Sequence, residues 1–228
     1  AINEEVRRTM SSRLVRLGYS EVVAGRPFTN PEGSQFDLTV LQYMAETLFQ
    51  ILMKPEALPT EPRPLVRFLA ERGGRLHRIA LTKPELLLQP DDLTVVGFCG
   101  KKRPGVDRGP IDAVDDELIG ELPDHTHILS YSTLELESGN SCNLVLFSDP
   151  QGISHWSSSD KHVLAVSMSP GYYTVIRLHN AYLPGGIMSN NKLILIRTKY
   201  IDYQEPTPWR AVREFLTSDE IETLGLAF

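Results

Sequence analysis

The stretch of the chain with the densest chemistry is Arg177-Leu-His179-Asn180, which runs into a glycine-rich loop at residues 183–186. Functional side chains often lie on such loops. A guanidinium can hold a carboxylate or phosphate, an imidazole can move a proton near neutral pH, and an amide can hydrogen-bond a developing oxyanion. We therefore predict Arg177, His179 and Asn180 as catalytic residues. The alternative is helix capping, because Arg and His favour a helix C-terminus and Asn and Gly favour the turn after it.

Two further histidines, His155 and His162, lie on either side of the serine-rich segment 157–159. On one continuous helix they would be separated by about 10 Å along its axis. That spacing is too long to chelate one metal ion, which requires i, i+4 spacing on a helix. We predict no metal site, and we treat both histidines as candidate general bases. The alternative is a surface helix anchored by Trp156.

Aromatic residues near these histidines predict a substrate-binding surface. Trp156 lies between the two histidines, and Tyr172 and Tyr173 precede His179 by about two helical turns. Tyr131 lies on a predicted strand, where it can face a cavity. We predict these four aromatic residues as substrate-binding, with ordinary core packing as the alternative.

Composition excludes several classes of protein. Of the 228 residues, 41% are hydrophobic and 23% are charged, which is typical of a globular chain and not of a fibrous or disordered one. The net charge of −6 argues against a general binder of nucleic acid or anionic membranes. The longest apolar stretch, residues 36–53, is interrupted by Asp37 and Glu46, so it does not predict a membrane span.

Cysteine content and the N-terminus bear on the compartment. Cys99 and Cys142 are the only two cysteines, which is too few for a fold built on disulfides. Residues 3–16 are charged and amphipathic, unlike a signal peptide, although a chain that begins at Ala1 leaves a removed upstream segment open. We expect a cytoplasmic protein with reduced thiols.

The first part of the chain, residues 1–92, predicts a mainly helical region. Apolar residues recur at helical spacing in residues 4–17 and 34–51, and residues 64–72 predict a short helix that ends at Gly73-Gly74. Residues 1–92 carry balanced charges, so residues 93–228 hold the whole net negative charge. With the turn-forming residues 89–92, this shift predicts a boundary there.

The second part predicts strands and helices in the order β-α-β-β-α-β. The strands are expected at residues 93–99, 128–137, 143–148 and 192–201, with a hairpin turn at residues 138–140 between the second and the third. The helices are expected at residues 111–122, amphipathic with acids on the polar side, and at residues 149–179. This is the order of a ferredoxin-like α+β unit with an antiparallel sheet, here over residues 93–205. Residues 206–228 predict a helical tail, with a helix near Trp209 and a capping box that begins at Thr217.

The third of these strands is apolar on both faces, because Leu144 and Leu146 alternate with Val145 and Phe147. Two helices can cover only one face of the sheet, so the other face requires a second cover. A second copy of the sheet would close a barrel-like homodimer. The competing cover is the helical first part of the same chain. Either arrangement predicts a sheltered cavity.

Short motifs in this region resemble a known family. Residues 128–132 (ILSYS), residues 143–148 (NLVLFS), His155-Trp156 and His162 resemble the dimeric α+β barrel superfamily, especially its antibiotic-biosynthesis-monooxygenase-like branch. The resemblance covers roughly residues 93–203. It implies cofactor-independent oxygenases of aromatic compounds, haem-degrading or haem-dependent enzymes, isomerases, or proteins without a known reaction. Haem-degrading members use an Asn on the first strand, which this chain lacks.

The residues and the resemblance together predict a small-molecule enzyme, monooxygenase-like, that acts on a hydrophobic or aromatic substrate in a cavity of a ferredoxin-like homodimer. We expect no cofactor and no nucleic-acid or membrane partner. The alternative is a non-catalytic dimerisation, assembly or ligand-binding protein with the same fold. A haem-binding protein is the third interpretation.

Overall fold

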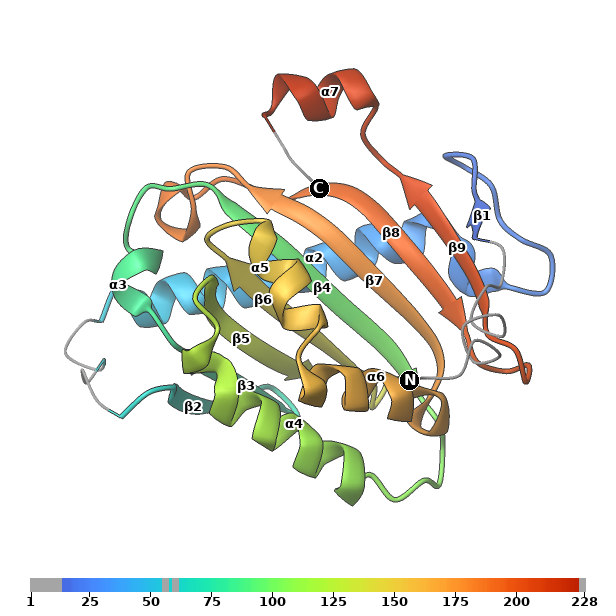
Figure 1. Ribbon diagram of the computed structural model, residues 1–228, viewed down its shortest axis with the longest axis horizontal. Helices are drawn as coiled ribbons and strands as arrows, with labels where there is room; N and C mark the ends of the chain where they lie inside the picture. Colours follow the sequence, from blue (N-terminus) through green and yellow to red (C-terminus); the bar gives the residue numbers. More distant parts are fainter. Residues whose placement is uncertain (1–13, 55–57, 59–61, 226–228) are drawn as a thin grey trace.

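The structure, a computed structural model, describes residues 14–54, 58 and 62–225. Within these residues, nine strands form one sheet in the order β1-β9-β8-β7-β4-β6-β5-β3-β2 (Figure 1). Strands β1 and β9 are parallel, and every other neighbouring pair is antiparallel. The strands are β1 (Val15–Arg16), β2 (Leu65–Ala70), β3 (Leu76–Leu81), β4 (Leu93–Lys102), β5 (Ile128–Glu135), β6 (Ser141–Phe147), β7 (Tyr173–Leu183), β8 (Ile194–Asp202) and β9 (Trp209–Glu214).

Helices cover both faces of the sheet. The long helix α2 (Pro31–Leu52) crosses one face, while α4 (Gly109–Glu121), α5 (Gln151–Ser157) and α6 (Asp160–Tyr172) lie on the other (Figure 1). A short helix α3 (Pro84–Leu87) precedes β4, and α7 (Ser218–Thr223) follows β9. Single 3-10 turns occur at Pro27–Thr29, Leu122–Asp124 and Ile187–Ser189.

Helix α2 provides the cover that the apolar sheet needs. It begins where the Asn30 side chain accepts a hydrogen bond from the Glu32 N–H, with Pro31 at the first helical position. Its buried face then packs on Leu144 and Leu146 of β6 in the main core; this face comprises Leu41, Met44, Leu48 and Leu52. The helix predicted at residues 34–51 is therefore present. It supplies, from the same chain, the cover for which a second copy was the alternative.

The predicted fold class is wrong. The order β-α-β-β-α-β does occur over residues 93–183, but its four strands are the middle of a large nine-stranded mixed sheet rather than a small ferredoxin-like unit with a helical extension. The fourth strand is β7, not residues 192–201, which form the next strand, β8. Strands from the first part of the chain extend one side of the sheet, where β3 pairs with β5.

Three predicted helices contribute to this error. Residues 64–72 contain β2, residues 173–179 belong to β7, and the residues around Trp209 form β9. Each segment is short or rich in β-branched and aromatic residues, and hydrophobic spacing alone does not separate helix from strand over so few positions. The predicted helix at 4–17 lies largely outside the described residues, and Val15–Arg16 within it form β1.

Other predicted elements are confirmed. Strand β4, helix α4 and the β5–β6 hairpin all occur, and Gly139 takes a positive φ of 78° in the hairpin turn. Helix α7 begins with the predicted capping box between Thr217 and Glu220.

The two cysteines are not reduced. Cys99 on β4 and Cys142 on β6 are direct cross-strand partners and form a disulfide with 4.3 Å between their Cα atoms. The two cysteines are 43 residues apart in the sequence, so their pairing could not be predicted without knowing that β4 and β6 are neighbours in the sheet.

A buried arginine on the sheet forms hydrogen bonds with the segment before α2. Arg213 on β9 is fully buried and donates hydrogen bonds to the backbone carbonyls of Gly18 (3.1 Å), Thr29 (2.8 Å) and Glu21. It also donates to the Tyr200 hydroxyl at 2.5 Å. These bonds satisfy a charge that would otherwise be costly to bury.

Candidate ligand-binding cavity

A cavity of about 520 Å³ lies between the sheet and the helices α4 and α6. Strands β2 to β7 contribute its floor, and α4, α5 and α6 enclose it from the other side. The lining residues from all these elements together form the cavity wall. Its volume falls within the range of roughly 300–1,000 Å³ that is typical of small-molecule sites. The sequence analysis expected a cavity under the second cover of the sheet, but α2 packs there as a solid core, and the cavity lies instead on the face that α4, α5 and α6 cover.

The alternation of side chains along each strand builds the floor. On β6, Ser141, Asn143 and Val145 line the cavity, while the residues between them face α2. Strand β4 does the same with Val96 and Phe98. The sheet thus separates a cavity face from a solid core face.

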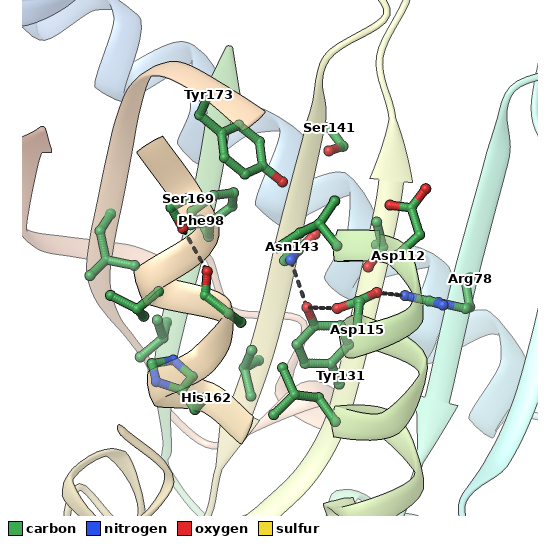
Figure 2. Close-up of a pocket in the computed structure, with 18 of the residues that line it drawn as sticks. Arg78, Phe98, Asp112, Asp115, Tyr131, Ser141, Asn143, His162, Ser169 and Tyr173 are labelled. Atoms are coloured by element: carbon green, nitrogen blue, oxygen red, sulfur yellow. Dashed lines mark hydrogen bonds and ion pairs between the residues drawn. The ribbon is translucent and has the colours of Figure 1, made fainter. Parts of the chain in front are cut away.

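A polar network crosses the cavity floor (Figure 2). The Tyr131 hydroxyl donates to Asp115 at 2.9 Å and accepts from the Asn143 side-chain amide at 2.7 Å. Arg78 on β3 donates to the second oxygen of Asp115. Burial, together with the negative charge of Asp115, raises the pKa of Tyr131 well above its ordinary value. Tyr131 is therefore a neutral phenol held in a fixed orientation.

The charged groups on the wall balance one another. Three cations, Arg78, Lys102 and Arg108, face three acids, Asp112, Asp115 and Glu135. Arg78 pairs with Asp115 and Arg108 pairs with Asp112 at 3.4 Å. Burial lowers the pKa of Lys102, and the charge of Arg108 lowers it further. With three charges of each sign, the cavity wall has no net preference for a charged guest.

The apolar end of the cavity is built around Trp156 on α5. Its ring makes edge and tilted contacts with Tyr131 at 5.9 Å, Phe147 at 6.0 Å and His162 at 4.6 Å between centroids. Burial lowers the pKa of His162, and a hydrogen bond to the Ser157 backbone opposes that shift. The ring is therefore mainly uncharged at neutral pH.

Several buried polar atoms on the cavity wall have no hydrogen-bond partner among the described residues. They are Arg108 Nη1, Thr133 Oγ1, Trp156 Nε1 and His162 Nδ1. Such buried atoms are rare in folded proteins, because each lost hydrogen bond costs about 1–3 kcal/mol. Four of the eleven such atoms found among the described residues line this one cavity.

A second polar cluster lies on the opposite face of the sheet, under α2. Asp37 accepts two hydrogen bonds from Arg177 (2.6 and 3.0 Å) and one from His179 Nε2 (2.9 Å). The other ring nitrogen of His179 bonds Thr198 Oγ1 at 2.9 Å. Burial alone would raise the pKa of Asp37, but the bonds from His179 and Arg177 outweigh it and hold the pKa below its ordinary value.

The metal-binding potential of the described residues is concentrated in this second cluster. A carboxylate oxygen of Asp37, a ring nitrogen of His179 and Cys99 Sγ lie within 4.8 Å of one another, and all three residues are buried. The two histidines that the sequence analysis weighed for chelation are not near one another in this way: His162 lines the cavity and His155 does not.

The predicted site residues are thus divided among different places. The cavity brings together Tyr131, Trp156, His162 and Tyr173. Arg177 and His179 instead join the cluster under α2, and Asn180 is buried away from the cavity lining. Helix capping, the alternative for these three residues, does not occur either, because they lie in the middle of β7.

The remaining two predicted residues also lie outside the cavity lining. His155 is exposed and stacks on His127 with 6.3 Å between ring centroids. Tyr172 is half-buried, with the Arg108 guanidinium 5.9 Å from its ring centroid. His155 on α5 and Tyr172 on α6 therefore lie on sides of their helices that do not line the cavity.

Sequence reasoning missed the polar half of the cavity. Asp115 lies among the acids on the polar side of a predicted amphipathic helix, and Arg78 lies on a strand that was not predicted at all. One signal was available: Asn143 is the polar first residue of an otherwise apolar predicted strand, and a polar side chain withdrawn from water requires a partner.

No family model matches the chain, and no curated protein matches it. Among the residues that the structure describes, no helix has both the length and the apolar character needed to cross a bilayer. The cavity geometry is therefore what carries any functional assignment.

Proposed function

We propose that this protein binds a small, mainly apolar, uncharged molecule that carries one or more acceptor oxygens, in the cavity between α4, α6 and the sheet. The observation that carries the proposal is the set of unpartnered buried polar atoms on the cavity wall. Trp156 Nε1 and Arg108 Nη1 can only donate hydrogen bonds, so they would pair with acceptor oxygens of the guest.

The remaining features of the wall support this ligand class. Apolar side chains of α4, α5 and α6 surround most of the cavity and would remove an aromatic or alicyclic guest from water; they include Ile111, Leu118, Ile153, Ala165 and Val166. The lining carries three positive and three negative side chains, so it has no net charge that would attract a charged ligand.

A calorimetric titration with two matched probes tests the proposal. 2-Acetonaphthone carries one carbonyl oxygen, and 2-ethylnaphthalene has nearly the same shape without it. A net hydrogen bond of about 0.5–1.5 kcal/mol predicts that the ketone binds about 2- to 12-fold more tightly.

Two variants of α6 provide the matched control. Ala165 lines the cavity, so Ala165→Phe should fill it and abolish binding of both probes. Val163 is 52% exposed on the same helix and does not line the cavity, so Val163→Phe should leave both affinities unchanged. Absence of binding, or binding that Ala165→Phe does not affect, would refute the proposal.

A catalytic step on the bound molecule is the second candidate, favoured by His162. Its Nδ1 is buried without a hydrogen-bond partner among the described residues, and its ring centroid lies 4.6 Å from that of Trp156. In the neutral tautomer that carries its proton on Nε2, Nδ1 has a free lone pair. The Trp156 N–H would polarise a carbonyl of the ligand, and His162 Nδ1 would remove a proton from the carbon next to that carbonyl.

Exchange of the methyl protons of 2-acetonaphthone in D₂O, followed by proton NMR, tests this step. We expect the wild type to accelerate the exchange and His162→Gln to lose the acceleration while it still binds the ketone. Equal exchange rates with the two proteins would leave binding as the function. The monooxygenase-like reaction, the homodimer, haem and the superfamily resemblance are not needed for either candidate and remain predictions.

A further inference from the structure

We propose that the buried cluster under α2 is a redox-controlled zinc site. When the Cys99–Cys142 disulfide is reduced, the two thiolates, His179 and Asp37 bind one Zn²⁺, and formation of the disulfide abolishes the site. The proposal concerns the face of the sheet opposite the cavity and is independent of the proposed ligand.

The sheet register brings three of the four ligands together, and α2 supplies the fourth, Asp37. Cys99 on β4 is directly opposite Cys142 on β6, and on its other side it is opposite Arg177 on β7, two residues before His179. Ligand atoms of Cys99, His179 and Asp37 already lie within 4.8 Å of one another. Zinc bonds of about 2.0–2.3 Å place tetrahedral ligands roughly 3.3–3.8 Å apart, so the side chains need to close by about 1 Å.

The burial of the set fits a closed structural zinc site rather than an open catalytic one. Cys142 and His179 are fully buried, and Asp37 is only 2% exposed. Two thiolates, one imidazole and one carboxylate provide four ligands for a tetrahedral ion without any water.

Groups beside the ligands already orient them for metal. Thr198 Oγ1 bonds His179 Nδ1, which leaves Nε2 directed at Asp37. At present a proton on Nε2 occupies the position between these two residues, and a metal ion would replace it. The His179 proton then moves to Nδ1, where the Thr198 hydroxyl can accept it, because a hydroxyl both donates and accepts.

Charge explains why the site depends on redox state. In the disulfide form, the negative charge of Asp37 is matched by Arg177, so a divalent cation would add two uncompensated charges to a buried position. Two thiolates remove this cost, because Zn²⁺, two thiolates, Asp37 and Arg177 together sum to zero.

The redox step balances with an ordinary dithiol as the reductant. The dithiol transfers two electrons and two protons to the Cys99–Cys142 bond and becomes a disulfide itself. Zinc then displaces the protons of both thiols, while the His179 proton only changes nitrogen. Each bound ion should therefore release two protons.

Cobalt binding to the full-length protein tests the proposal, with a phosphine in place of the dithiol so that the reductant does not chelate the metal. We expect the reduced wild type to bind one Co²⁺ per chain, with ligand-field bands of a tetrahedral ion and a thiolate charge-transfer band that added Zn²⁺ removes. The oxidised protein should bind none. A reduced chain that binds no cobalt, or an oxidised chain that binds it equally, would overturn the proposal.

Variants test the assignment of the ligands. Cys142→Ser and His179→Gln should each lose the tetrahedral spectrum, whereas His77→Gln, which alters a fully buried histidine elsewhere on the sheet, should retain it. If a ligand variant fails to fold, the oxidised and reduced wild-type proteins still decide the matter. A pH-stat titration should record two protons released per Zn²⁺, and release of none would contradict the thiolate set.

Discussion

Replacing Asp37 by Asn should destabilise the oxidised protein severely. Asp37 is 2% exposed and accepts three hydrogen bonds, two from Arg177 and one from His179. An amide of the same shape has no negative charge and turns an NH₂ group toward these donors, so Arg177, whose side chain is 22% exposed, loses its buried counter-ion. Removing one partner of a buried ion pair costs about 3–5 kcal/mol. In a chain of this size, that predicts a fall of about 6–20 °C in the melting temperature.

The matched control lies on the same helix. Glu46 pairs with Lys192 at 2.8 Å, but the side chains are 49% and 73% exposed. An exposed pair contributes only about 0–1 kcal/mol, so Glu46→Gln should lower the melting temperature by less than about 4 °C. Both variants should be measured by thermal unfolding followed by circular dichroism, under non-reducing conditions. If Asp37→Asn costs no more than Glu46→Gln, burial does not make the Asp37–Arg177 pair more important to stability than an exposed pair.

Three further predictions concern stability. Leu48→Ala should cost about 2–5 kcal/mol in urea unfolding because Leu48 is fully buried, while Phe36→Ala on the exposed side of α2 should change stability by less than about 0.5 kcal/mol. Arg213→Met should cost about 2–5 kcal/mol and speed proteolysis of residues 18–29, since it leaves buried carbonyls without a donor; unchanged proteolysis would contradict this role. Burial lowers the pKa of both His77 and His162 in the folded state, so the unfolded chain takes up protons first as the pH falls. The contribution of these two histidines to the unfolding free energy should therefore be fully present above about pH 6.5 and decline below it. His162→Gln should make the unfolding free energy fall less steeply with decreasing pH.

The sequence predicted correctly those elements that depend on residues close together in the chain. The capping box at Thr217, the Gly139 hairpin turn and the amphipathic helix α2 all follow from neighbouring residues, and all three are present. Strand β7 was not predicted, because Tyr172, Ile176 and His179 also fit one face of a helix. The pairing of β7 with β4 and β8 decides its conformation, and that pairing is not visible in its own residues.

The β2–β3 hairpin shows the same limit. Gly73 and Gly74 were interpreted as the end of a helix, but both take positive φ (80° and 76°) in the tight turn between two strands. Without β3 in the predicted sheet, Arg78 could not be placed beside Asp115.

For the candidate site too, the residue types could be predicted from the sequence but the strand register could not. Trp156 and Tyr131 were predicted to bind a substrate and His162 to act as a general base, and the structure places all three around one cavity. His179 has equally suitable chemistry but points to the other face of the sheet, because one position along a strand reverses the direction of a side chain. Residue type identified the candidates, and only the register of β7 separates them.

The most direct test of a guest in the cavity is the indole N–H signal of Trp156. The chain has two tryptophans, so a proton–nitrogen NMR spectrum should show two indole signals, which Trp209→Phe would assign. During titration with 2-acetonaphthone, the Trp156 signal should move downfield and saturate, because its unpartnered Nε1–H gains a carbonyl acceptor, while the Trp209 signal stays in place. If the Trp156 signal does not move, or if both signals move together without saturating, the ketone does not bind in this cavity.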